Sequence, residues 1–174
     1  MPQFIRFIKK SDYPDSEYPF SIPAVRAIES FNFDHAVTFL VGENGSGKST
    51  IIEAMAVAAG FNAEGGTKNY SFSTQDTTSS LADHITLVRG PQRERAGYFL
   101  RAESFYTTAS YMDTGAAMQT GKRIHEQSHG EAFLSIINDF RAGLFFLDEP
   151  ESALSPQRQL ALMARMHQLT NEGA

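Results

Sequence analysis

The sequence predicts an α/β fold in which a mixed β-sheet is flanked by helices. Two continuous apolar runs, residues 36–41 and 144–147, have the length and composition of buried strands. Residues 49–59 and 156–169 instead carry apolar side chains at helical spacing. Strand-forming and helix-forming segments that follow one another along a chain are typical of an α/β protein.

Three shorter segments add an N-terminal antiparallel part to this prediction. Residues 4–8 alternate apolar and basic side chains, as a half-buried strand does. Residues 84–89 and 97–101 also have strand composition, and the connection between them, 90–95, contains Gly and Pro. We therefore expect these two strands to form a hairpin.

The C-terminal half predicts helices. Residues 131–140 carry five large apolar side chains on one side of a helix, and we expect a small helical lobe over about 104–140. Ser155 and Pro156 are suited to the N-cap and first position of the last helix. A chain of 174 residues is long enough for one core, so we expect a single domain over 1–174.

Composition limits the classes of function. The net charge is −5, which gives no overall indication of a nucleic-acid or anionic-membrane surface. The absence of cysteine excludes disulfides and thiolate metal sites and fits a reducing compartment. The first ten residues lack a signal-peptide core, and no apolar run has the length of a membrane span. We expect a cytoplasmic protein without direct membrane insertion.

A glycine-rich segment lies between a predicted strand and a predicted helix. It reads Gly42-Glu43-Asn44-Gly45-Ser46-Gly47-Lys48-Ser49-Thr50 and matches the pattern G-x-x-x-x-G-K-[ST] in full. Such glycines let backbone N–H groups surround phosphates, and the helix that follows directs its positive end at them. Lys48 then reaches the β- and γ-phosphates and the Ser49 hydroxyl ligates Mg²⁺. The segment predicts binding of a triphosphate with Mg²⁺, and a glycine-rich turn without a ligand is the alternative.

A second motif supplies carboxylates at the end of the strand predicted at 144–147. Asp148 can hold the Mg²⁺ shell, and Glu149 can polarise the water that attacks the γ-phosphate. By itself, the motif also fits a buried strand that meets an acidic turn. Together with the glycine loop, it predicts hydrolysis, with Glu149 and Lys48 as catalytic residues.

These two motifs carry a resemblance to a known family. Residues 42–50, with Leu147-Asp148-Glu149-Pro150 about a hundred residues later, resemble the ABC-type ATPase cassette, especially its soluble branch with the SMC and RecF proteins and small ATPases. The resemblance spans roughly 36–169. It implies a P-loop NTPase fold of the ABC type that hydrolyses ATP as a head-to-tail dimer formed around the nucleotide.

The resemblance also implies a signature segment that caps the γ-phosphate of ATP held by a second subunit. Residues 127–131 occupy the corresponding place before the acidic strand. Ser128 and Gly130 match the family pattern, while Gln127, His129 and Glu131 depart from its transporter form. We expect an ATP-dependent homodimer in which Ser128 and Gly130 contact the nucleotide of the second subunit. The alternative is that Ser128 is an ordinary N-cap of the following helix.

Two further positions follow from the family pattern. Glu103, just after the strand at 97–101, stands where the family has a glutamine that senses Mg²⁺ and water, or is a plain surface glutamate. The family has an aromatic residue that stacks on adenine about 25 residues before the glycine loop. Tyr18 and Phe20 are the candidates, and either one equally suits a core position.

The cassette normally continues into a strand that ends in a Thr-His pair, which this sequence lacks, so we expect the native chain to continue beyond Ala174. A chain that binds ATP with impaired turnover is the alternative. The glycine loop and the segment at 127–131 favour a soluble ATPase with DNA or a protein as its partner. The alternatives are the ATP-binding subunit of a membrane transporter and an ATP-gated dimerisation module without turnover.

Overall fold

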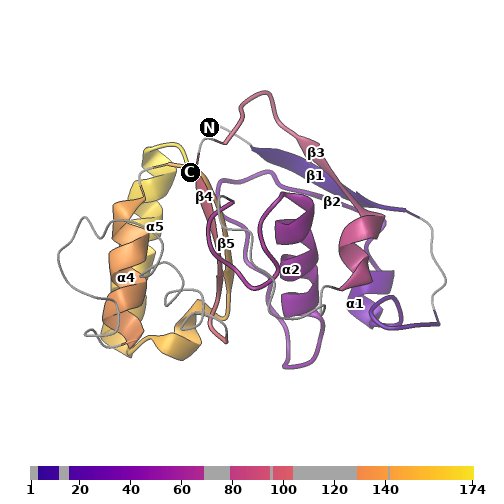
Figure 1. Cartoon of the computed structure of the whole chain (residues 1–174), viewed down its shortest axis with the longest axis horizontal. Coiled ribbons are helices and arrows are strands. Elements are labelled where there is room, and N and C mark those ends of the chain that lie inside the picture. The colour runs from indigo at the N-terminus through magenta and orange to yellow at the C-terminus, as the bar shows by residue number, and fades with distance from the viewer. Residues whose placement is uncertain (1–3, 12–15, 69–78, 95, 104–128, 141) are drawn as a thin grey trace. The chain divides into compact units, whose positions relative to one another are not determined.

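The computed structural model describes residues 4–11, 16–68, 79–94, 96–103, 129–140 and 142–174. By their internal contacts the residues form two compact units (Figure 1). The first unit comprises Met1–Ala63 and Lys68–Glu94, and the second comprises Glu64–Thr67 and Arg95–Ala174. The expectation of a single domain over 1–174 stays a prediction.

The sheet of the first unit has three antiparallel strands. β1 (Ile5–Lys10) lies between β2 (Ser30–Asn32) and β3 (Ile85–Arg89). In β1, the side chains of Ile5 and Ile8 are buried while Arg6 and Lys9 are exposed, which is the half-buried pattern that the sequence predicts. The N-terminal strand and its antiparallel pairing are therefore confirmed.

One helix dominates the first unit. α2 (Lys48–Ala58) contacts β3 and the 3₁₀-helix η1 (Ser80–His84), and a short α1 (Pro23–Arg26) precedes the strand β2. The predicted helix at 49–59 is confirmed, because Ile51, Ala54 and Met55 form its buried face. Gly60 follows the helix with φ of 95°, a conformation that favours glycine and ends the helix.

The second unit has a parallel pair of strands covered by two helices. β4 (Gly97–Arg101) and β5 (Leu144–Asp148) pair in register, with Tyr98 opposite Phe145. The helices are α4 (His129–Asp139) and α5 (Pro156–Asn171), and a 3₁₀-helix η3 (Pro150–Ala153) connects β5 to α5. Figure 1 shows α4 and α5 side by side next to the two strands. The predicted strand at 144–147 and both predicted helices are confirmed.

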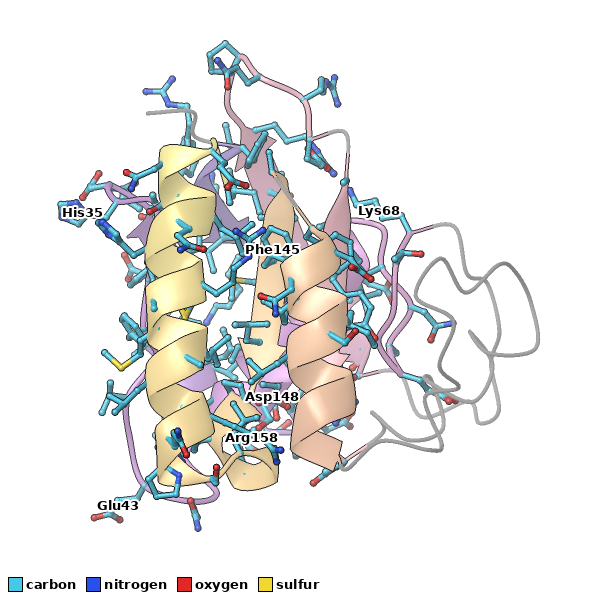
Figure 2. The ribbon with its side chains drawn as sticks, turned by 90° about the vertical axis from the view of Figure 1, so that its left-hand side faces the viewer. His35, Glu43, Lys68, Phe145, Asp148 and Arg158 are labelled. Carbon is cyan, nitrogen blue, oxygen red and sulfur yellow. The ribbon has the colours of Figure 1, made fainter. Side chains whose placement is uncertain are left out.

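One apolar cluster joins the helices of the second unit to one face of the strands. Its buried members are Tyr98, Leu100, Ile137, Leu154, Leu162 and Leu169. The ring of Phe140 packs against Tyr98 and Phe145 at centroid distances of 5.6 Å and 5.3 Å. Figure 2 shows Phe145 on β5 behind the two helices. The guanidinium of Arg165 on α5 donates to the carbonyl oxygen of Phe140, which fixes α5 to the end of α4.

Two predictions about strands are wrong. Residues 36–41 form no strand, and the side chains of Phe39 and Val41 are 73% and 92% exposed. An apolar run becomes a strand only when a neighbouring strand completes its hydrogen bonds, and none of the described strands pairs with this segment. The predicted hairpin of 84–89 with 97–101 is also absent from the described residues, since β3 pairs with β1 and β4 pairs with β5.

The predicted lobe over 104–140 is described only in part. Residues 104–128 lie outside the described residues, while α4 belongs to the core of the second unit. Within the described ranges, no helix is both long and apolar enough to cross a membrane.

Candidate functional site

The glycine loop turns directly into the N-terminus of α2. The amide of Ser46 donates to the carbonyl oxygen of Glu43 at 3.2 Å, and that of Ile51 donates to Gly47 at 3.0 Å. Gly45 and Gly47 have φ values of 78° and 98°, which glycine adopts far more readily than other residues. Gly47 is also the N-cap of α2. The sequence therefore builds the loop and the start of the helix as one continuous turn.

Close contacts limit the space at two of the loop glycines. A Cβ atom on Gly47 would lie 2.7 Å from Cγ2 of Ile22, and one on Gly42 would lie 2.9 Å from Oγ of Ser46. No described atom lies within 4 Å of a Cβ on Gly45, so that position needs glycine for its backbone conformation alone. The loop is compact at Gly42 and Gly47 and open at Gly45.

The side chain of Lys48 folds back over the loop. Its Nζ donates to the carbonyl oxygens of Gly42 at 2.9 Å and Glu43 at 2.8 Å. Lys48, Ser49 and Thr50 form the first turn of α2, where backbone N–H groups have no acceptor within the helix. A cation, N–H groups that have no acceptor within the helix and the positive end of a helix dipole therefore meet at one loop, which is exposed from Gly42 to Gly45. This arrangement fits phosphate groups.

The two aromatic candidates differ sharply in burial. Phe20 is buried and packs edge-to-face against His84, with ring centroids 5.1 Å apart, whereas Tyr18 is exposed. Phe20 is thus a core residue. Tyr18 is on the same segment as Ile22, which contacts Gly47 of the loop. An exposed aromatic ring can stack on a base, whereas a buried one cannot, so Tyr18 is the candidate that stays a prediction.

The acidic residues lie in the second unit, at the carboxyl end of β5 (Figure 2). Ligands of parallel sheets generally bind at this end of the strands. The Asp148 side chain is 10% exposed, while Glu149 is exposed and has φ of 49° and ψ of 45°. A left-handed backbone is rare for glutamate and is frequent at functional sites. The hydroxyl of Ser152 donates to the Glu149 carbonyl oxygen at 2.9 Å and holds this turn.

Sequence reasoning missed one residue next to this carboxylate. Arg101 ends β4 directly opposite Asp148, with its Nε 3.9 Å from Oδ2 of Asp148. Its Nη2 lies 3.8 Å from Oε2 of Glu103. The signal available in the sequence was a cationic residue at the end of a predicted strand. The partner strand of β4 was predicted incorrectly, so Asp148 could not be recognised as the neighbour of Arg101.

The donor types present suit Mg²⁺ bound together with a nucleotide. Within the described residues, no cluster of three or more His, Cys, Asp or Glu side chains has the arrangement of a metal site. Mg²⁺ commonly uses one or two protein oxygens and completes its shell with phosphate and water. A serine hydroxyl, as on Ser49, and a carboxylate, as on Asp148, are donor groups of the type that Mg²⁺ takes.

The predicted signature residues are described only in part. Ser128 lies outside the described residues, and Gly130 is the second residue of α4. Glu103 follows β4 with its side chain 86% exposed, so it remains either a site residue or a surface glutamate.

A comparison with family models decides the family. Residues 21–134 match the model described as AAA domain, and this segment includes the whole glycine loop. The chain belongs to the AAA domain family. Its members are P-loop ATPases, so this AAA domain is a nucleotide-binding domain of that class. Searches of curated proteins and of solved structures found no match. The matched segment ends before Asp148 and Glu149. The assignment of these two residues to the candidate site therefore depends on their chemistry and geometry alone.

Proposed function

We propose that this AAA domain binds and hydrolyses ATP with Mg²⁺, and that it does so as a head-to-tail dimer of the ABC type. The observation that carries the proposal is the phosphate loop. Lys48, two glycines with positive φ and the N-terminus of α2 converge in this loop. A P-loop of this form provides both the charge and the N–H donors that a triphosphate requires.

Each part of the proposed site has a separate role. The loop from Gly42 to Thr50 holds the β- and γ-phosphates, and Tyr18 stacks on the adenine. Ser49 and Asp148 hold Mg²⁺, which when bound neutralises charge on the phosphates. Ser128 and Gly130 cap the γ-phosphate held by the second subunit.

Glu149 is the proposed general base. Its carboxylate takes a proton from water as the water oxygen bonds to the γ-phosphorus, and the bond from that phosphorus to the bridging oxygen breaks to release ADP. Its exposed side chain and left-handed backbone support this role, because strained conformations of non-glycine residues are concentrated at functional sites.

The proposal is tested with Glu149→Gln, using Glu172→Gln as the control. Glu172 is a carboxylate in the second unit that pairs with Arg165 at 3.5 Å, and it has no role in the proposed site. We expect Glu149→Gln to reduce phosphate release by at least about a hundredfold while nucleotide binding persists. Glu172→Gln should keep its turnover.

The oligomeric state is measured in the same experiment. Light scattering should detect dimers of Glu149→Gln with Mg²⁺-ATP and monomers with ADP. Dimers that form with ATP while the unmodified chain releases no phosphate would instead identify an ATP-gated dimerisation module. Unchanged turnover in Glu149→Gln would refute the assigned base.

A further inference from the structure

The carboxyl ends of β4 and β5 bring a cation next to the proposed Mg²⁺ ligand. The two strands are parallel and paired in register, so Arg101 and Asp148 end the strands side by side. By strand alternation, both residues are on the same face as Phe99 and Phe146, opposite the face that carries Tyr98 and packs against α4 and α5. The juxtaposition is therefore fixed by the sheet and not by a loop.

The guanidinium of Arg101 stands between two carboxylates in very different surroundings. Its Nε is 3.9 Å from Asp148 and its Nη2 is 3.8 Å from Glu103. The side chains of Arg101, Asp148 and Glu103 are 21%, 10% and 86% exposed, respectively. Arginine keeps its charge at every physiological pH, so its position decides which carboxylate it neutralises.

We propose that Arg101 is a positioning residue that competes with Mg²⁺ for Asp148, and that Glu103 is the alternative partner of Arg101 when the cation binds. This inference rests on the proposed function, because it takes Asp148 to be part of the Mg²⁺ site. Arg101 then sets the Mg²⁺ concentration at which the domain binds Mg²⁺-ATP.

Electrostatics supports both parts of this competition. A poorly solvated carboxylate needs a nearby cation, and Arg101 lies close enough to Asp148 to provide one. A divalent cation at Asp148 repels the guanidinium at this short range, so the two cations favour different positions. Glu103 is already within ion-pair distance and lies at the surface, where Arg101 can remain charged and solvated.

The test measures binding of a fluorescent ATP analogue at increasing Mg²⁺ and, separately, in EDTA. We expect Arg101→Gln to lower the Mg²⁺ concentration for half-maximal binding of the ATP analogue by about fivefold, because the variant removes a partly exposed ion pair that competes with Mg²⁺. Arg101→Lys should stay close to the unmodified protein because it keeps the charge. Glu103→Gln should raise the half-maximal concentration by about twofold, since Arg101 then loses its alternative partner.

The EDTA measurement separates this role from a structural one. Binding in EDTA depends on the phosphate loop, so it should be equal in all variants, whereas a damaged fold would weaken binding with and without Mg²⁺. Glu172→Gln serves as the control carboxylate in the same unit and should match the unmodified protein. If Arg101→Gln does not fold, the upward shift in Glu103→Gln decides the proposal by itself.

Each of the following results would overturn the inference. A half-maximal Mg²⁺ concentration that is unchanged or higher in folded Arg101→Gln excludes competition, as does an unchanged or lower value in Glu103→Gln. If the unmodified protein binds no ATP analogue under any condition, the proposed function itself fails, and this inference fails with it. Normal binding by the unmodified protein with no shift in either variant refutes the inference alone.

Discussion

Nζ of Lys48 lies 2.9 Å from the carbonyl oxygen of Gly42, so the lysine of the phosphate loop is hydrogen-bonded to the loop itself. A second bond to the Glu43 carbonyl oxygen, at 2.8 Å, completes this arrangement. These two bonds hold the ammonium against the loop, which limits the side-chain entropy that nucleotide binding must overcome.

The first prediction separates the binding role of Lys48 from its contribution to stability. Lys48→Ala should weaken nucleotide binding by at least about tenfold, the equivalent of one hydrogen bond to a charged group. The free energy of unfolding should change by less than about 0.5 kcal/mol, because the lost bonds are exposed. Calorimetric titration and urea unfolding measure the two quantities. Lys9→Ala, at an exposed position of β1, is the control, and equal affinities of the two variants would contradict the prediction.

The second prediction concerns the two loop glycines with positive φ. Gly45→Ala should destabilise the domain by about 1 kcal/mol through backbone strain alone. Gly47→Ala also creates a close contact with Ile22, so its loss of stability should exceed that of Gly45→Ala by about 1 kcal/mol or more. Unfolding in urea measures both variants. Combining Gly47→Ala with Ile22→Ala should remove the excess cost, and a strictly additive loss in the double variant would show that the contact has no effect.

The third prediction concerns Glu94, whose side chain is 6% exposed between Lys68 and Arg89. Burial by itself raises the pKa of Glu94, but hydrogen bonds from Lys68 and Arg89 outweigh it and lower the pKa from 4.5 to about 2. The unfolded chain therefore takes up the proton first as the pH falls. This carboxylate stabilises the fold above about pH 5, and that stabilisation is lost progressively towards pH 2.

Glu94→Gln tests this dependence. The variant should be about 3 kcal/mol less stable than the unmodified protein at pH 7, and the difference should shrink steadily as the pH is lowered from 5 to 3. Urea unfolding over this pH range is the measurement. The exposed Glu29→Gln is the control for loss of a carboxylate. A difference between Glu94→Gln and the unmodified protein that is the same at pH 7 and pH 3 would rule out the lowered pKa.

The elements that the sequence predicts well are those fixed by local signals. The helix at Pro156 begins where a proline suits the first turn, and α2 ends where Gly60 adopts a positive φ. Strand pairing depends instead on contacts distant in sequence. β4 has strand composition at the predicted residues, yet its partner is β5 and not the nearer β3. Residues 36–41 have the same apolar character and form no strand.

The candidate site divides in the same way. The phosphate loop is a continuous stretch of sequence, so its residues could be predicted together, and their local geometry follows from glycine and helix capping. Arg101 and Asp148 are far apart in the chain and meet only through the register of two parallel strands. The burial of Glu94 could not be predicted for a related reason. A short charged connection is usually solvated, and only the structure shows that Lys68 and Arg89 pair with Glu94.

The fourth prediction distinguishes Tyr18 from Phe20. Tyr18→Ala should weaken ATP binding by about tenfold through lost stacking and leave stability nearly unchanged, since the side chain is exposed. Phe20→Ala should instead destabilise the domain by about 3 kcal/mol, because it removes a buried ring that contacts His84. Nucleotide titration and thermal unfolding measure the two effects. If Tyr18→Ala bound ATP as tightly as the unmodified protein, another group would have to contact the adenine.

The last prediction tests the strained backbone of Glu149, which has φ of 49°. Glu149→Gly should increase the free energy of unfolding by roughly 1 kcal/mol, because glycine adopts this conformation without a Cβ penalty. Glu149→Gln keeps the Cβ and the strain, so its stability should equal that of the unmodified protein. Both variants should lose hydrolysis if the carboxylate is the base. Urea unfolding and phosphate release are the two measurements. Ser152→Ala removes the hydroxyl that donates to the Glu149 carbonyl oxygen. This variant should lower stability while the carboxylate of Glu149 is kept. A Glu149→Gly variant less stable than Glu149→Gln would mean that the side chain, and not the backbone strain, dominates at this position.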